Sequence, residues 1–317
     1  MRAYIIRRLM LLIPILLGIS LMIFLIMQFI PGDVISGMLG IEETPELRAQ
    51  LEKKLGLDQP LYKQYINWIS KAVRGDFGTS FRTGKDIFPE IMSRFKITFQ
   101  LTIMAAIISW IIAIPLGILS AMKRNSIIDG FVRFISLLGV SVPSFALATL
   151  AILLLSKGFN YYPSVGYVDI TVDPIRNLEI MFLPAIILGS SMAGSVMRMT
   201  RSSLLETLRQ DFIKTIRAKG ASEKVVLFVH SLKNALIPII TLIGMQIGSL
   251  LGGAVVIEQI FSIPGLGLMT LTGINQRDFP VVQGCVLFIA FVYVIVNLTV
   301  DILYTYIDPR ITYKAGR

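Results

Sequence analysis

The chain has 317 residues, of which 54% are hydrophobic and only 16% are charged. An average soluble domain carries about 25% charged residues, so this composition predicts an integral membrane protein and excludes a chain surrounded by water on all sides. The net charge of +10 does not indicate a nucleic-acid partner, because the basic residues lie between apolar runs. The chain has one cysteine, Cys285, and one histidine, His230, which excludes an internal disulfide and a soft-ligand metal cluster.

Six apolar stretches are each long enough to cross roughly 30 Å of hydrocarbon, which takes about 20 helical residues. In chain order they are about Leu9–Ile30, Ile97–Met122, Phe131–Ser156, Ile180–Met199, Leu236–Ile257 and Val281–Ile307. The first is expected to be a retained span and not a signal peptide, because its apolar run is long and the following QFIPGDVIS offers no small-x-small cleavage site.

Lys and Arg residues in the short flanks of these spans set the expected orientation. With the N-terminus inside, the inner segments hold 17 of them and the short outer loops hold three. The other ten lie between Arg48 and Lys96, in a loop long enough to be translocated regardless of its charge. We therefore expect an all-α integral membrane protein with six transmembrane helices and both termini in the cytoplasm.

The long outer loop, about Pro31–Phe95, has helical patterning of its own. Thr44 is a plausible N-cap before Pro45, and Gly56 is expected to end the first of two helices. Helical spacing continues through its apolar residues Leu47, Leu51, Leu55, Leu61, Tyr65, Trp68 and Ile69. The pattern predicts a small helical cap on the outer face, with a mere spacer as the alternative.

The nearest approach to a phosphate-binding loop is GTSFRTGKD, residues Gly78–Asp86. Five residues separate its glycines where a P-loop has four, and Asp86 replaces the hydroxyl that would hold magnesium. We therefore reject a nucleotide site here. No convergent acid, base or nucleophile set is apparent either, so a membrane enzyme is a weak alternative and any energy source is expected in another subunit.

The basic segment Arg198–Lys233 is expected to form two amphipathic helices. The first covers about Ser203–Lys219 and ends at Gly220, and Ser222 is the expected N-cap of the second. The expected apolar faces are Leu204, Leu208, Phe212 and Ile216 in the first helix, and Val225, Val229, Leu232 and Leu236 in the second. On residue patterns alone, a docking role and a simple topology determinant both remain open.

Small residues recur at steps of four in the fourth and fifth spans, where they allow close helix packing. The fourth span pairs Gly189 with Ala193 and Ser190 with Gly194, and the fifth carries Gly244, Gly248 and Gly252 beside the polar Gln246. Ordinary intramolecular packing and a face that lines a pathway are both compatible with this pattern. Few other polar residues lie in the spans, which argues against a stand-alone, ion-coupled secondary transporter.

Several motifs together resemble one known family. The stretch DFIKTIRAKGASEKVVLFVHSLKNALIP resembles the cytoplasmic EAA-type loop of ATP-binding-cassette (ABC) importer permeases, in the version of the oligopeptide/dipeptide permease family. Other matching pieces, in the family's order, are YIIRRLMLLIPILLGIS, PGD (Pro31–Asp33), RGDFGTS, EQIFSIPGLG, RDFPVVQG and DPR (Asp308–Arg310). The chain is most similar to the first, B-type, permease subunit. Lys214-Thr215-Ile216 replaces the general Glu-Ala-Ala, a departure that is typical of the peptide subgroup.

The resemblance implies a type I importer permease fold and a coupling function for Asp211–Ser222. In this family a short helix of that loop sits in a groove of an ATP-hydrolysing subunit and passes its movement to the spans. By position, the ATPase-coupling residues are Asp211, Phe212, Ile216, Arg217, Ala218, Lys219, Gly220, Ala221 and Ser222. Gly244, Gln246, Gly248 and Gly252 remain the candidates for packing or for the pathway.

The resemblance also implies the rest of the machine. The expected partners are a homologous second permease, two ABC ATPase subunits that bind ATP and magnesium, an extracytoplasmic solute-binding protein and the lipid bilayer of a bacterial or archaeal cell membrane. The chain itself is expected to be non-catalytic and to bind no cofactor. Its expected parts are an N-terminal helix with the outer loop (1–95), a permease domain (96–308) with the coupling loop at about 198–235, and a tail (309–317).

Peptides are the expected substrate. Nickel chelates, glutathione and oligosaccharides are alternatives, because related importers carry them. The outer region Thr44–Phe95 and the segment Glu258–Pro280 are the expected contacts for the binding protein or an outer gate.

Overall fold

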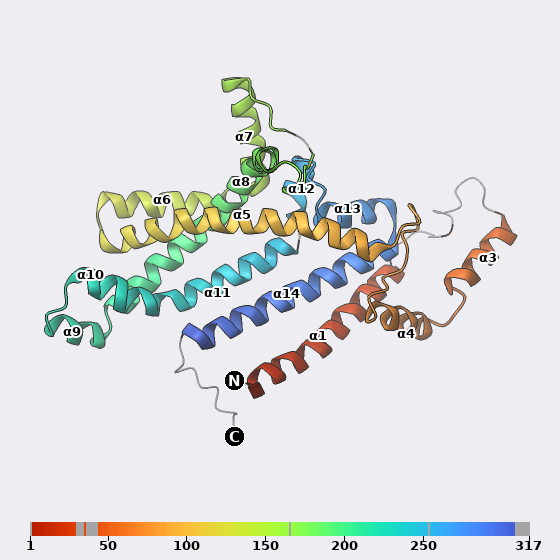
Figure 1. The fold of residues 1–317 in the computed structure, drawn as a ribbon, viewed down its shortest axis with the longest axis horizontal. Helices are drawn as coiled ribbons and strands as arrows, with labels where there is room; N and C mark the ends of the chain where they lie inside the picture. Colours follow the sequence, from red (N-terminus) through yellow and green to blue (C-terminus); the bar gives the residue numbers. More distant parts are fainter. Residues whose placement is uncertain (1, 30–34, 36–43, 165, 253, 308–317) are drawn as a thin grey trace. The chain divides into compact units, whose positions relative to one another are not determined.

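The computed structural model describes residues 2–29, 35, 44–164, 166–252 and 254–307. They form two compact units: residues 1–98, 252–255 and 264–294 make the first, and residues 99–251, 256–263 and 295–317 make the second. In the described residues the only extended pairing is an isolated bridge between Thr79 and Asp86, so the expected all-α class is confirmed there (Figure 1). The expected tail 309–317 and the motifs at Pro31–Asp33 and Asp308–Arg310 lie outside the described residues.

Within the part of the chain that the structure describes, five stretches of helix are long and apolar enough to cross a membrane. They lie in α1 (Arg2–Phe29), α5 (Ile87–Met122), α8 (Pro174–Leu208), the run from Glu223 to Leu251 that ends in α11 (Leu232–Leu251), and α14 (Phe279–Ile307). They correspond to five of the six expected spans, although α5 and α8 extend well beyond the expected ends. The expected span Leu236–Ile257 is too long, since α11 stops at Leu251 and a separate helix, α12 (Val255–Ile260), follows.

The expected continuous span Phe131–Ser156 is wrong. It consists of two helices, α6 (Ile127–Ser141) and α7 (Ser144–Phe159), which are bent by 102° at the break between them. Val142 has φ −89° and ψ 120°, the extended conformation that a following proline favours, and Pro143 then precedes α7. Six spans are counted only if this bent pair is taken as one.

The outer loop contains the two expected helices, α3 (Pro45–Leu55) and α4 (Leu61–Ala72). The Thr44 side chain accepts a hydrogen bond from the amide of Leu47 at 3.2 Å, and Gly56 ends α3 with φ +70°. Helix α4 packs on α1, because the Tyr65 hydroxyl lies 2.9 Å from that of Ser20 and the Tyr65 ring lies 5.5 Å from that of Phe24. The aromatic residues of the predicted pattern therefore hold the cap against the first span.

The loop at residues 78–86 is closed by its own contacts within the first unit. The backbone amide of Ser80 donates a hydrogen bond to the carbonyl of Lys85, and the backbone amide of Ile87 donates one to the carbonyl of Gly78. The buried carboxylate of Asp278, between α13 (Leu266–Gln276) and α14, accepts from the Ser80 hydroxyl at 2.5 Å and from the Phe81 amide at 3.1 Å. These donors serve an internal carboxylate, which agrees with the rejection of a nucleotide site.

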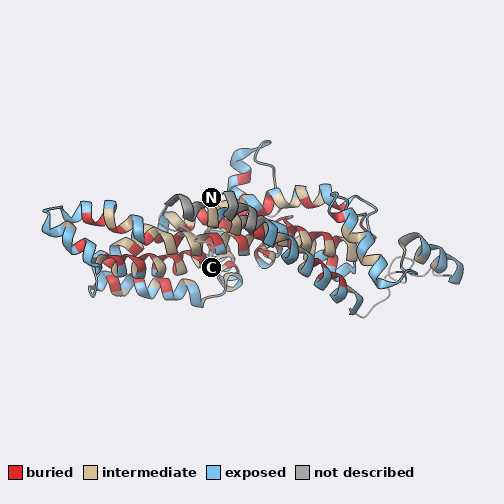
Figure 2. Cartoon of the chain, turned by 90° about the horizontal axis from the view of Figure 1, so that it is seen from below, coloured by how far each residue is buried: buried red, intermediate tan, exposed pale blue. Residues whose placement is uncertain are grey.

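Helix α8 is the centre of the second unit, and small residues bring its neighbours close. A Cβ on Gly194 would lie 2.6 Å from the carbonyl oxygen of Ser136 in α6, and one on Gly189 would lie 2.7 Å from that of Ala105 in α5. The expected packing role of Gly189 and Gly194 is therefore confirmed. Outward-facing positions of the helices carry large apolar side chains such as Ile111, which is 68% exposed, as a lipid-facing surface requires. Figure 2 shows the exposed positions of the helices in pale blue.

Candidate functional site

The basic segment after α8 folds into a compact bend, which we call the coupling bend (residues 209–225). It contains α9 (Asp211–Ala218), a turn at residues 219–222 and α10 (Glu223–Val225), and it joins the end of α8 to the start of the next span (Figure 1). The expected single helix Ser203–Lys219 is wrong, because α8 ends at Leu208 and Gln210 is extended with ψ 150°.

The break before α9 changes which side chain is buried. Leu204 in α8 is fully buried, but Phe212 is 37% exposed, so the expected apolar face does not continue through the bend. Ile213 is fully buried instead. Because α8 ends at Leu208, α9 takes a different direction, in which Ile213 is buried and the charged residues of the bend remain exposed to water.

Gly220 ends α9 in the left-handed conformation, with φ +85°. The amide of Gly220 bonds the carbonyl of Arg217 at 2.9 Å, and the amide of Ala221 bonds that of Ile216 at 3.4 Å. This pair of bonds is the Schellman arrangement that glycine permits at a helix end. The expected stop at Gly220 is confirmed, and it fixes the direction in which the chain leaves α9.

A charged pair closes the two ends of the turn. Arg217 donates from Nε to one carboxylate oxygen of Glu223 at 2.7 Å and from Nη2 to the other at 3.0 Å. The hydrogen bond to Glu223 raises the pKa of Arg217, and a hydrogen bond from Lys214 lowers the pKa of Asp211. Both side chains are exposed to water, which screens their attraction, so this bidentate clamp defines the shape of the turn more than it stabilises the fold.

A π-helical segment, η2 (Val226–Ser231), follows α10. The buried Ser231 hydroxyl donates to the carbonyl of Val226, five residues earlier, at 2.8 Å. The wider turn shifts the helical phase, so Val226 and Leu227 are buried while Val225 and Val229 are exposed. The expected apolar face through Val225 and Val229 is therefore wrong.

Exposed apolar side chains are present in the coupling bend and in the η2 segment that follows it. Phe212 is 37% exposed, Val225 40%, Phe228 54% and Val229 58%. Exposed apolar side chains next to exposed charges suit contact with a protein groove, because apolar anchors and polar neighbours are typical of interfaces.

The predicted coupling residues lie together on this bend. Ile216 and Ala221 are half-buried, and the exposed members are Asp211, Phe212, Arg217, Ala218, Lys219, Gly220 and Ser222. Ser222 has the expected N-cap position, but its side chain makes no capping hydrogen bond to α10. Glu223, which completes the clamp, is not among the predicted coupling residues.

The predicted glycine face of the fifth span is only partly present. Gly244 and Gly248 are buried in α11, and a Cβ on Gly244 would overlap Val300 of α14. The side-chain amide of Gln246 donates to the carbonyl of Met192 in α8 at 3.4 Å, while its Oε1 is buried without a partner among the described residues. Gly252 lies beyond the end of α11, so the three glycines do not share one helix face.

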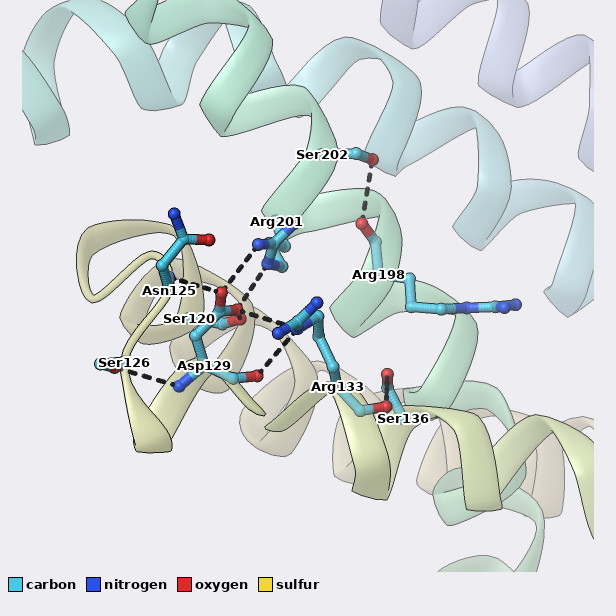
Figure 3. A network of polar contacts seen from close by, with 9 residues as sticks. All are labelled: Ser120, Asn125, Ser126, Asp129, Arg133, Ser136, Arg198, Arg201 and Ser202. Carbon is cyan, nitrogen blue, oxygen red and sulfur yellow. Dashed lines mark hydrogen bonds and ion pairs between the residues drawn. The ribbon is translucent and has the colours of Figure 1, made fainter. Parts of the chain in front are cut away.

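A buried charge cluster around Asp129 was not predicted from the sequence (Figure 3). Asp129 is fully buried and accepts from Nε and Nη2 of Arg201 at 2.7 and 2.9 Å and from the Ser120 hydroxyl at 2.6 Å. It also accepts from the amide of Asn125 at 2.9 Å. The cluster joins α6 to the end of α5 and to α8, two turns before the coupling bend. Arg201 is 72 residues away in sequence, so no local pattern reveals the pair.

No metal centre is present among the described residues, since no three His, Cys, Asp or Glu side chains converge there.

Comparison with known families identifies relatives over almost the entire chain. Residues 113–313 match the family described as the inner membrane component of binding-protein-dependent transport systems, and residues 1–102 match the N-terminal family of such membrane components.

Three curated relatives are similar over 99% of this chain and 100% of their own lengths. The dipeptide transport system permease protein DppB of Alkalihalophilus pseudofirmus is 42% identical, and that of Escherichia coli K12 is 40% identical. The oligopeptide transport system permease protein AppB of Bacillus subtilis is 41% identical.

One solved structure with a similar fold is the MetNI methionine ABC transporter in an inward-facing conformation. The similarity has a TM-score of 0.53 at 18% identity, and it covers 69% of this chain and 96% of that chain. At this identity the comparison supports the permease fold and not a shared substrate.

Proposed function

Since this chain belongs to the family of inner membrane components of binding-protein-dependent transport systems, we propose that it is a permease subunit of an ATP-driven peptide importer. The chain is a multi-pass protein of the cell membrane. It would form half of a translocation path with a homologous second permease. Two ATPase subunits that bind ATP and magnesium would supply the energy, and an extracytoplasmic binding protein would deliver the substrate.

The geometry of the coupling bend is the observation that carries this proposal. A buried Ile213, the Gly220 turn and the Arg217–Glu223 clamp give the bend a defined shape between two candidate spans. A rigid element attached to both spans can transmit displacement, whereas a flexible loop would absorb it. The exposed Phe212 and Ala218–Ser222 would contact the ATPase groove.

The proposed orientation has both termini in the cytoplasm, together with the coupling bend. The excess of Lys and Arg on the inner segments supports it. We also propose that residues 1–95 form an N-terminal part, made of the first transmembrane helix and the extracytoplasmic helical loop, and that residues 96–308 form the permease domain. The two family matches, which divide between residues 102 and 113, support a boundary near this point.

Peptides are the proposed substrate because the relatives that are 40–42% identical over full length are dipeptide and oligopeptide permeases. Proteoliposomes with the assembled importer and its binding protein should accumulate a labelled dipeptide when ATP is supplied. Nickel chelate, glutathione and an oligosaccharide are the comparison substrates. Transport of one of these without peptide uptake would contradict the peptide assignment but not the importer assignment.

Charge reversal at the clamp tests the coupling role. Arg217→Glu or Glu223→Arg replaces an attraction by a repulsion across the turn and distorts it, so each should lower ATP-driven uptake roughly tenfold, a size typical of lost coupling between two sites. The exchanged pair, Arg217→Glu with Glu223→Arg, restores the attraction and should recover a substantial part of the uptake. The measurement is peptide uptake in proteoliposomes at equal permease content.

A matched control for these variants is the exposed pair Arg176–Glu179, whose side-chain atoms lie 2.7 Å apart outside the bend. Arg176→Glu should leave uptake unchanged. Normal uptake by both single variants at the clamp, at normal expression, would show that the bend does not couple ATP hydrolysis to transport.

A further inference from the structure

A basic cavity lies beside the buried Asp129 cluster in the second unit. It has a volume of about 500 Å³ and is lined by four arginines, Arg124, Arg133, Arg201 and Arg209. Two carboxylates counter them: Glu206 in the lining, and Asp129, which is bonded to Arg201 and lies 3.6 Å from Arg133. The lining therefore keeps an excess of positive charge, as an anion-binding site requires.

The position of the cavity along the spans puts it at the edge of the hydrocarbon. Arg124 and Arg201 each follow the end of an expected span by two residues, since those spans end at about Met122 and Met199. Arg209 lies further out, directly after the end of α8 at Leu208. Lipid phosphates lie at this level of a membrane, where clustered arginines gain attraction from anionic headgroups. Each guanidinium also offers a planar fork of donors that matches two phosphate oxygens.

An exposed apolar surface continues from the cavity along α6. Leu137 follows Arg133 by one helical turn and is 54% exposed, and its neighbours Phe134 and Leu138 are 58% and 45% exposed. Contact with this apolar surface would not stabilise the binding of a small free anion. An acyl chain would cover it while its headgroup remained among the arginines.

We propose that this cavity binds the headgroup of an anionic phospholipid, with an acyl chain along α6. The ligand would bridge the α5–α6 connection, which carries Arg124, to the end of α8, which carries Arg209. Arg201 has a different role, because its bonds to Asp129 hold it in place and orient the lining (Figure 3). The inference concerns lipid binding by the chain and does not depend on which solute is transported.

Native mass spectrometry of the purified chain, titrated with phosphatidylglycerol or phosphatidylcholine, tests the proposal. The unchanged chain should prefer phosphatidylglycerol. Arg124→Gln, Arg133→Gln and Arg209→Gln should each lower that affinity about fivefold, and the triple variant should lower it roughly a hundredfold. Inorganic phosphate at the same concentration should not displace the lipid.

Two controls separate the site from general charge and from misfolding. Arg198→Gln removes an exposed arginine of α8 that is directed away from the Asp129 cluster, and it should leave lipid binding unchanged (Figure 3). A triple variant with lysine at positions 124, 133 and 209 keeps the charges and should retain the preference for phosphatidylglycerol.

Three results would overturn the proposal. They are equal binding of the two lipids by the unchanged chain, unchanged phosphatidylglycerol binding by the triple glutamine variant, and an equal loss in Arg198→Gln. Loss of ATPase-subunit association without loss of lipid binding would identify the cavity as a protein-docking surface instead.

Discussion

At the scale of single residues, the strongest expected effect on stability is at Asp129. Asp129→Asn leaves the guanidinium of Arg201 in the cluster without its counter-charge, and this side chain is only 21% exposed. Breaking a buried pair from one side costs about 3–5 kcal/mol, and we expect about 3 because Arg201 keeps some contact with water. Unfolding of the purified chain in detergent measures the loss. The control is Glu179→Gln, which breaks the exposed Arg176–Glu179 pair and should lower the free energy of unfolding by less than about 1 kcal/mol. Equal losses of stability in the two variants would contradict the special role of Asp129.

Gly220 permits a second prediction at this scale. A Cβ there would meet nothing within 4 Å, so Gly220→Ala is penalised only by the backbone, whose φ is +85°. The expected cost is about 1 kcal/mol for the local turn, together with reduced ATP-driven uptake. Gly130→Ala in α6, also in open space but with helical φ, should leave uptake intact and stability equal or slightly higher. If the two alanine variants behaved alike, the left-handed turn would not matter to coupling.

These residues also show which kind of information a sequence holds locally. Thr44, Gly56 and Gly220 were predicted correctly because a helix end depends on a few adjacent residues. Asp129 and Arg201 were missed because their pairing depends on how α6 and α8 pack, and nothing in either local sequence specifies that contact.

At the scale of helices, Gly194 determines how closely α6 approaches α8. Gly194→Ala would place a methyl group 2.6 Å from the carbonyl oxygen of Ser136, so the two helices would have to separate. Overpacking of this kind costs about 1–3 kcal/mol, which thermal unfolding in detergent can measure. Gly158→Ala in α7 is the matched control, because a Cβ there meets nothing within 4 Å. A stability loss of the same size at Gly158 would mean that helix propensity and not packing explains the effect.

Two errors in the predicted helices concern breaks in the regular α-helix that residue type alone does not determine. Pro115, Pro184 and Pro238 remain inside long helices, whereas Pro143 marks a break of 102°. A proline alone therefore does not determine where a membrane helix bends, because other groups can satisfy the backbone carbonyl that it frees. The π-helical segment likewise shifts the buried face from Val225 and Val229 to Val226 and Leu227, because burial of these side chains outweighs the regular period of an α-helix.

At the scale of the molecule, the orientation in the membrane is the prediction on which the coupling role depends. Cys285 is the only cysteine and is fully buried, so the unchanged chain should react little with a membrane-impermeant maleimide. Asp58→Cys introduces a thiol in the exposed connection between α3 and α4, and Lys224→Cys introduces one in the exposed start of α10. If the coupling bend faces the cytoplasm, intact cells should label Asp58→Cys, and Lys224→Cys should label only after permeabilisation.

The reverse labelling pattern would have consequences beyond topology. It would place the bend on the side without ATP, where no ATPase subunit could dock on Phe212 or on residues 218–222. It would also put the basic cavity near Arg124 and Arg201 in the outer leaflet, since both arginines follow the inner ends of the expected spans by two residues. Lipid binding by the purified chain would survive such a result, but coupling to cytoplasmic ATP hydrolysis would not. The labelling experiment therefore separates the two proposals, because only the importer function requires the bend to be inside.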